Sequence, residues 1–183
     1  MRRRPAPTKK RTTSRSRRAL TPKVNVLIED DRWATALPRL VTLTRRFATL
    51  ALETEDRAKA ETTVVLSTDS VVRGLNRRFR QKDSPTNVLA FPAARVGRTL
   101  NPAKTAEIGE IILAFETVRK EAVTQGKPFV NHLAHLVIHG ILHLLGYDHE
   151  APGEARVMER LEADILSMLG MPNPYGGGRP HRG

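Results

Sequence analysis

The apolar residues of this 183-residue chain recur with two different periods, which predict alternating strands and helices. Short runs rich in β-branched residues predict four strands, at residues 24–28, 62–67, 87–91 and 107–114. Segments whose apolar residues recur every three or four positions predict five helices, at residues 32–52, 69–79, 116–125, 128–145 and 153–169. The initial order of strand, helix and strand predicts a parallel pair with a right-handed crossover. The expected fold is therefore a single α/β (α+β) domain, with a mixed sheet of about four strands packed with about five helices.

The positive charge of the chain is concentrated near its start. Residues 1–21 contain nine Lys or Arg and no acid, and the whole chain has a formal net charge of +12. These residues have too little apolar surface to offset the entropy cost of ordering, so we expect a disordered basic arm. Such an arm suits contact with nucleic acid, with a solubilising tail or a transit peptide as alternatives. Residues 22–170 are then the folded domain, and the Pro- and Gly-rich residues 171–183 are expected to form a flexible tail.

The amino-acid composition limits which side chains can bind a metal and where in the cell the protein is expected. The chain has no cysteine, so disulfides and thiolate metal sites are excluded, and histidine and carboxylate remain as possible ligands. It has no run of about 18 apolar residues and no apolar signal-peptide core. We therefore expect a cytoplasmic protein with no membrane partner.

Five of the six histidines are clustered in one apolar segment. His139 and His143 are four residues apart on a predicted helix, so their imidazoles leave the same face one turn apart. Gly146 is suited to end that helix in a left-handed conformation, and the turn after it can return His149 to the pair. The spacing is that of the metzincin zinc motif H-E-x-x-H-x-x-G-x-x-H, with Gly140 in place of the glutamate. We expect a zincin-like helix on which His139, His143 and His149 bind one Zn²⁺ per chain, with nickel or copper as alternatives.

Other residues are weaker candidates for the same site. His135 lies one turn before the first ligand and is interpreted as a supporting or core residue, and His132 as part of a solvated first turn. Glu110, within a predicted strand, either faces solvent or is an acid directed at the site. Arg80 ends an arginine-bearing helix and is the candidate catalytic residue, because a guanidinium stabilises charge that develops on phosphate. The candidate RNA-binding residues are Arg73, Arg77, Arg78 and Arg80, and the alternative for this helix is a solvated face.

Three stretches carry a resemblance to a known family: HGILHLLGYDH at 139–149, LNRRFRQKDSPTNVLAFP at 75–92 and GEIILA at 109–114. Over about residues 24–170 the chain resembles the YbeY-type endoribonucleases. The resemblance implies a zinc-dependent, single-strand-specific endoribonuclease that acts in ribosomal RNA maturation, chiefly at the 3′ end of the small-subunit RNA, and in ribosome quality control. It also implies single-stranded ribosomal RNA and the small ribosomal subunit with its proteins as partners. By motif position, the implied metal ligands are His139, His143 and His149, and the implied functional arginine is Arg80.

Two other functional classes stay open on the residues alone. A zincin-type metalloprotease would need a general base beside the zinc, which Gly140 cannot provide. A noncatalytic RNA-binding ribosome-assembly factor with a structural metal is the second alternative, although structural zinc more often has four protein ligands. Aromatic residues are only 4% of the chain, so we expect RNA to be held mainly through its phosphates.

Overall fold

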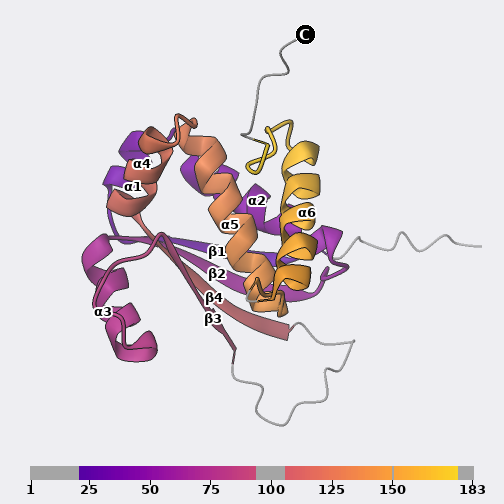
Figure 1. Cartoon of the computed structure of the whole chain (residues 1–183), viewed down its shortest axis with the longest axis horizontal. Helices are drawn as coiled ribbons and strands as arrows, with labels where there is room; N and C mark the ends of the chain where they lie inside the picture. Colours follow the sequence, from indigo (N-terminus) through magenta and orange to yellow (C-terminus); the bar gives the residue numbers. More distant parts are fainter. Residues whose placement is uncertain (1–20, 94–105, 150, 177–183) are drawn as a thin grey trace, which may run out of the picture.

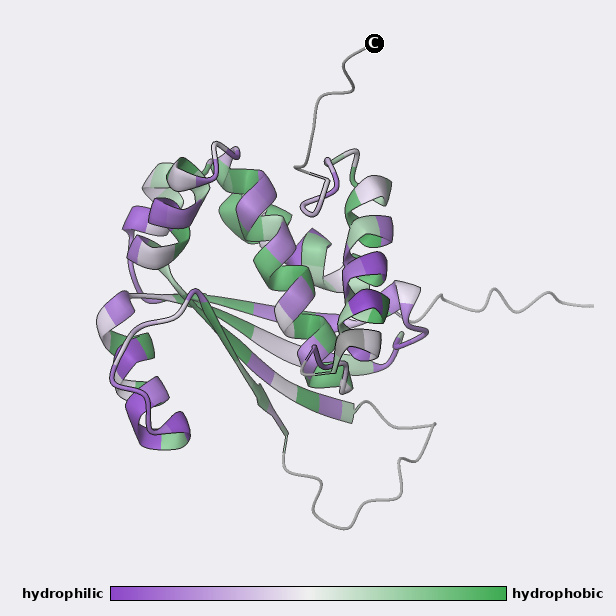
Figure 2. Cartoon of the chain, viewed as in Figure 1, coloured by the Kyte–Doolittle hydropathy of each residue, from purple (hydrophilic) through white to green (hydrophobic). Residues whose placement is uncertain are grey.

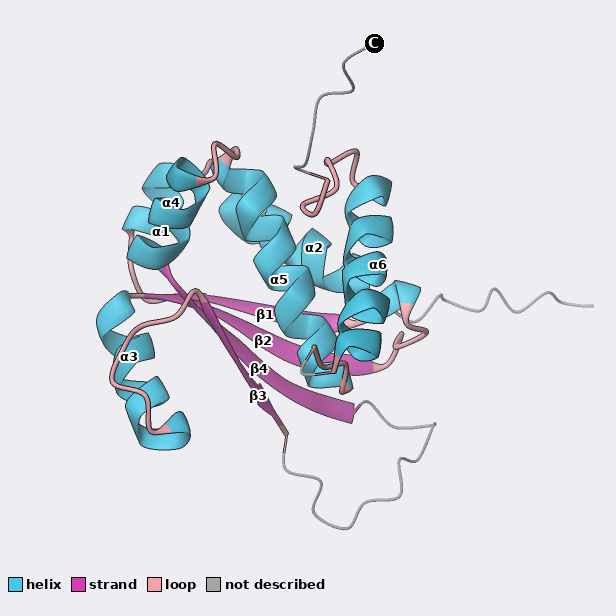
Figure 3. Cartoon of the chain, viewed as in Figure 1, coloured by secondary structure: helices cyan, strands magenta, loops and turns pink. Residues whose placement is uncertain are grey.

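The computed structural model describes residues 21–93, 106–149 and 151–176. Within these residues four strands and six helices form one α/β domain (Figures 1 and 3). The strands are β1 (Lys23–Ile28), β2 (Ala60–Ser67), β3 (Val88–Pro92) and β4 (Ala106–Ala114). The helices are α1 (Arg32–Ala36), α2 (Leu40–Thr54), α3 (Asp69–Arg80), α4 (Phe115–Thr124), α5 (Phe129–Leu145) and α6 (Pro152–Met168). The basic arm expected at the start of the chain lies almost entirely outside the described residues.

The four strands form one mixed sheet in the order β1-β2-β4-β3, which confirms the expected fold class. β1 and β4 both run parallel to β2, and β3 pairs antiparallel with β4. One rung crosses the whole sheet through Val26, Val64, Ile111 and Ala90. β3 is therefore an edge strand, and its outer side is not paired with any described strand.

The two faces of the sheet are covered unequally. Val64 and Ile111 point into the main core, which they share with residues of α2, α5 and α6. Their neighbours Val65 and Ile112 point to the opposite face and join a smaller cluster that includes Val72 of α3. In Figure 1 the other helices gather on one side of the sheet, and α3 lies on the other. This second face is only partly covered.

The helix expected over residues 32–52 is two helices, and the expectation of a continuous helix was wrong. Pro38 disfavours helical geometry at the residue before it, and Leu37 is extended, with φ −141° and ψ 107°. Arg39 then takes a left-handed conformation, with φ 61°, before α2 begins. Trp33 of α1 and Leu40 of α2 are nevertheless both buried.

The start of α3 is tied to the start of α4 by reciprocal hydrogen bonds. The Asp69 carboxylate accepts hydrogen bonds from the backbone N–H and the hydroxyl of Thr117, each over 2.9 Å. In return, Glu116 accepts one from the backbone N–H of Asp69 over 2.9 Å. Carboxylates at helix N-termini satisfy free N–H groups and complement the helix dipole. These contacts fix the orientation of α3, which carries the arginines, relative to the sheet.

No helix in the described ranges combines the length and the apolar character that a membrane span requires.

Candidate metal centre

The histidines lie on α5, the most buried helix of the domain. Leu133, Val137, Ile141 and Leu144 are buried against the core. Figure 2 shows the resulting pattern along α5, in which hydrophobic and hydrophilic residues alternate around the helix. The helix ends at Gly146, which has φ 97° and donates its backbone N–H to the carbonyl of His143. The apolar stripe therefore determines which side of α5 carries the histidines.

The structure brings His139, His143 and His149 together. Nε2 of His139 and Nε2 of His143 are 3.0 Å apart, and the His149 ring centroid lies 5.6 Å from that of His139 and 5.1 Å from that of His143. One nitrogen from each ring lies within 4.8 Å of the others. Imidazole nitrogens that converge in this way fit a zinc ion, for which Zn–N distances are about 2.0–2.1 Å.

The turn after α5 is held in place by its own hydrogen bonds. The backbone N–H of Tyr147 donates to the carbonyl of Leu142 over 3.1 Å. The Tyr147 hydroxyl donates to Glu55, at the end of α2, over 2.5 Å. The Asp148 carboxylate accepts a hydrogen bond from the backbone N–H of His149 over 2.7 Å. These contacts position His149 opposite the two helical histidines.

Behind the three histidines lies a buried carboxylate from α6. Glu162 has no solvent exposure, and its two oxygens contact His139 Nδ1 at 2.7 Å and His135 Nε2 at 2.8 Å. The hydroxyl of Tyr175 also donates to Glu162. Burial alone would raise the pKa of Glu162, but the hydrogen bonds from His135, His139 and Tyr175 lower it to about 2. The carboxylate is therefore ionised and acts only as an acceptor.

This carboxylate determines which nitrogen of His139 carries the proton. Because Glu162 is ionised, Nδ1 of His139 must donate to it, and the lone pair of His139 is left on Nε2, the nitrogen that faces His143. Burial, together with the neighbouring His139 and His149, lowers the pKa of His143. A neutral imidazole is the form that binds a metal.

A second group of possible ligands overlaps the first. His135, His139 and Glu162 also bring one ligand atom each within 4.8 Å of the others. Glu162 is fully buried, whereas His139 and His143 are half-buried and His149 is exposed. The three-histidine group includes an exposed residue, whereas the second group includes a fully buried carboxylate that is already hydrogen-bonded to His135, His139 and Tyr175. We assign His135 and Glu162 a supporting role.

Gly140 packs against the sheet instead of facing the histidines. A Cβ at this position would lie 2.9 Å from Cγ2 of Ile111 on β4, closer than real Cβ contacts. α5 therefore approaches β4 closely at this point, and a side chain such as the zincin glutamate does not fit.

Several of the remaining candidates lie away from the histidines. Arg80 is the last residue of α3, is exposed, and forms no ion pair within the described ranges. It does not lie among the histidines, but α3 and α5 both contact the edge strand β3 from its two faces. Glu110 is exposed on the α3 side of the sheet, because Ile111 beside it faces α5. Of the two interpretations of Glu110, the solvent-facing one is correct.

His132 is not part of a solvated turn, and that expectation was wrong. Its side chain is 3% exposed and contacts Glu121 of α4 over 2.8 Å. Glu121 also accepts hydrogen bonds from the side chain of Asn87, just before β3. Burial lowers the pKa of His132, although Glu121 opposes this effect. His132 therefore joins α4, α5 and the start of β3 inside the core.

Two supporting residues were not predicted from the sequence. Glu162 is a single acid on the buried stripe of α6, between Met158 and Ile165, and an acid in that pattern is a usable signal. Tyr175 belongs to the segment expected to be a flexible tail. Up to residue 176 the structure places this segment against the domain, since Met171 packs on the core and Lys127 donates to the carbonyl of Pro174 over 3.3 Å. Nothing in the local sequence predicts these contacts.

The chain is similar to known proteins over most of its length. The family model described as "Endoribonuclease YbeY" matches residues 25–170. A protein named Endoribonuclease YbeY from Rhodopseudomonas palustris (strain BisA53) is 46% identical over 155 residues, which cover 84% of this chain and 90% of the relative. The protein of the same name from Azorhizobium caulinodans is 44% identical over 155 residues, covering 83% of this chain and 95% of the relative.

A solved structure shares the fold. The solution structure of TM1509 from Thermotoga maritima has a TM-score of 0.52 and 24% sequence identity, and the match covers 85% of this chain and 99% of that chain. At that identity the likeness supports the fold alone. The family model and the relatives cover most of the chain at substantial identity, so the chain belongs to the YbeY endoribonuclease family.

Proposed function

We propose that this protein is a zinc-dependent endoribonuclease that cuts single-stranded RNA, with one Zn²⁺ per chain. The observation that carries the proposal is the convergence of His139, His143 and His149 on one partly open position, within a chain of the YbeY family. Three neutral imidazoles and an accessible fourth position are typical of a catalytic site. A structural metal would more often have four protein ligands, which disfavours the noncatalytic alternative.

Each residue of the site has a definite task in this proposal. The three histidines would hold Zn²⁺, and the bound metal would supply a Lewis acid and a nucleophilic water near neutral pH. Glu162 holds the proton on Nδ1 of His139 and fixes the orientation of that ring. Tyr147 and Glu55 hold the turn that presents His149. A metalloprotease is disfavoured, because the position of the usual general base is Gly140 and the sheet fills the space beside it.

We assign to Arg80 the binding of the scissile phosphate. Arg80 is exposed and unpaired within the described residues, so its guanidinium is available for a two-point contact to phosphate oxygens. It ends α3 beside the edge strand β3, and α5 packs on the other face of that strand. A single-stranded substrate that passes around this edge would meet both the arginine and the histidines. Arg73, Arg77 and Arg78 are proposed as further RNA contacts.

The biological substrate that we propose is ribosomal RNA. Membership of the family supports action at the 3′ end of the small-subunit RNA, in the cytoplasm, together with small-subunit proteins and in ribosome quality control. The nine basic residues among residues 1–21 lie outside the matched region and suit an additional contact with RNA.

The proposal is tested by measuring zinc content and single-turnover cleavage of a single-stranded RNA side by side. We expect about one zinc per wild-type chain and cleavage that is abolished by a chelator. Arg80→Ala should keep its zinc and lose about 10²-fold or more in cleavage rate, and Arg80→Lys should recover only part of that loss. His149→Ala should lose zinc instead.

The matched control is Arg119→Ala, which removes an exposed arginine from α4 and should cleave like the wild type. An unfolded protein is included as a second substrate. Zinc-loaded wild-type protein that cuts the unfolded protein and leaves RNA intact would refute the proposal. Wild-type cleavage by Arg80→Ala would remove Arg80 from the mechanism.

A further inference from the structure

An exposed aromatic ring lies at the end of α3, beside Arg80. Phe79 is 57% exposed, more than Tyr175, the other exposed aromatic side chain among the described residues. Its ring meets the ring of Phe91 on β3 edge to face, with the centroids 5.4 Å apart and the planes at 70°. The guanidinium of Arg78 lies 5.1 Å from the centroid of the Phe79 ring. Phe79 is therefore held by two neighbours while more than half of it faces solvent.

The surroundings of Phe79 are strongly positive. Arg77, Arg78 and Arg80 occupy the last turn of α3, and all three are exposed. Arg73, one turn or more earlier, is instead paired with Asp83 over 2.8 Å. Figure 2 shows α3 as a largely hydrophilic helix. An exposed ring among arginines is the combination that proteins use to bind single-stranded nucleic acid, because rings stack on bases and arginines contact phosphates.

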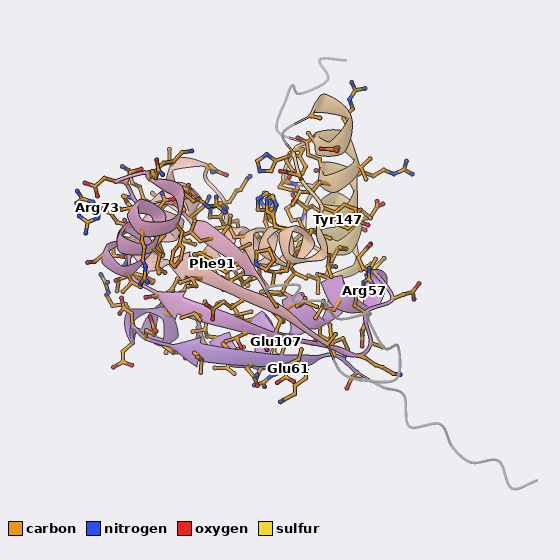
Figure 4. The ribbon with its side chains drawn as sticks, turned by 90° about the horizontal axis from the view of Figure 1, so that it is seen from below. Arg57, Glu61, Arg73, Phe91, Glu107 and Tyr147 are labelled. Atoms are coloured by element: carbon orange, nitrogen blue, oxygen red, sulfur yellow. The ribbon has the colours of Figure 1, made fainter. Side chains whose placement is uncertain are left out.

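The same strand segment carries the metal helix on its other face. Phe91 is paired with Glu110, and the neighbouring residue Ala90 is paired with Ile111, the residue that contacts Gly140 of α5. Phe91 on the edge strand β3 is therefore adjacent to Ala90, whose partner Ile111 on β4 lies against α5. In the view of Figure 4, Phe91 lies between Arg73 on α3 and Tyr147 at the end of α5. A strand of RNA that follows this edge has a short path between the two faces.

We propose that Phe79 is a stacking platform for one base of a single-stranded RNA, supported by Phe91 and Arg78. Arg77 and Arg80 contact the phosphates on either side of that base. Glu110 is exposed on the same face of the sheet, paired with Phe91, and repels phosphate, so the phosphates lie toward the arginines of α3 and away from β4. This inference rests on the proposed function, and it adds a subsite that binds the base next to the phosphate held by Arg80.

The test measures the binding of a short RNA that contains the fluorescent base 2-aminopurine to the zinc-loaded full chain. Phe79→Leu keeps an apolar side chain of similar size and removes the ring, and we expect binding about 10-fold weaker and less quenching of the base. Phe79→Tyr keeps the ring and should bind within about 2-fold of the wild type. The control Val123→Ala alters another exposed apolar residue, which is 76% exposed on α4, and should have no effect.

A matched RNA with abasic positions separates stacking from other contributions. The difference between wild type and Phe79→Leu should vanish with this RNA, since it offers no base to stack. The proposal would be overturned if wild type and Phe79→Leu bound the 2-aminopurine RNA equally tightly. It would also be overturned if Phe79→Leu lost the same amount of affinity for both RNAs. That second result would indicate a nonspecific or protein-binding role for the ring. Wild-type protein that binds and quenches but does not cleave would refute the proposed function and still support the stacking site.

Discussion

Glu162 accepts a hydrogen bond from Nδ1 of His139 over 2.7 Å and thereby joins the buried face of α6 to the metal-binding face of α5. Glu162→Gln should weaken zinc binding by about 10- to 100-fold, because the amide is neutral and no longer fixes the His139 proton. Competition with a chromophoric chelator measures this affinity. Asp164→Asn, at an exposed position of the same helix, is the control and should bind zinc like the wild type. Unchanged affinity in Glu162→Gln would show that the carboxylate is only a packing element.

Gly140 should resist substitution, although alanine normally favours a helix. Gly140→Ala places a Cβ 2.9 Å from Ile111, and such overpacking costs about 1–3 kcal/mol, which exceeds the gain in helix propensity of about 1 kcal/mol. Gly74 on α3 has no neighbour within 4 Å of an added Cβ, so Gly74→Ala should increase the free energy of unfolding by about 0.5–1 kcal/mol. Denaturant unfolding of the two variants gives the comparison, and a stabilised Gly140→Ala would contradict the close approach of α5 to β4.

The buried His132 should make the protein less stable in mild acid. Burial lowers its pKa in the folded state, so the unfolded chain binds a proton more readily, and stability falls as the pH drops below about 6.5 toward the folded pKa. Glu121 opposes this shift, while His135 and Lys127 add to it. His132→Gln keeps a donor for Glu121. When the pH is lowered from about 7.5 to about 5.5, the melting temperature of this variant should fall less than that of the wild type. Both proteins are compared without zinc, so that release of the metal does not contribute. Parallel pH profiles would show that His132 does not titrate on unfolding.

Removal of residues 1–21 should weaken RNA binding and leave the chemical step intact. Residues 1–21 contribute nine positive charges. For each phosphate of a single strand that the truncated protein no longer neutralises, the slope of log K for RNA binding against log salt concentration should flatten by about 0.7. Titrations at several salt concentrations give this slope, and single-turnover rates at saturating RNA test the chemistry. An unchanged slope would show that the arm does not bind phosphates, and a lower rate at saturation would assign it a catalytic role.

The sequence alone determined those features that depend on residues close together in the chain. The periods of its apolar residues predicted the four strands and the position of α5, because each period reflects the geometry of one element. His139 and His143 share a helical face through their spacing of four, and Gly146 allows the turn that returns His149. Pro38 carries a local signal of the same kind, since it ends α1 through its effect on Leu37.

Only the tertiary structure decided what joins distant segments. Glu162 lies 23 residues beyond His139 and Tyr175 lies 40 residues beyond His135, and no local pattern encodes those pairs. The order β1-β2-β4-β3 puts β3 at the edge, and this order brings Phe79 against Phe91 and places Gly140 over Ile111. Strand order and helix packing arise from the burial of whole apolar faces against one another, so they depend on the entire chain at once. The supports of the metal site and the exposed ring at the sheet edge follow from that packing.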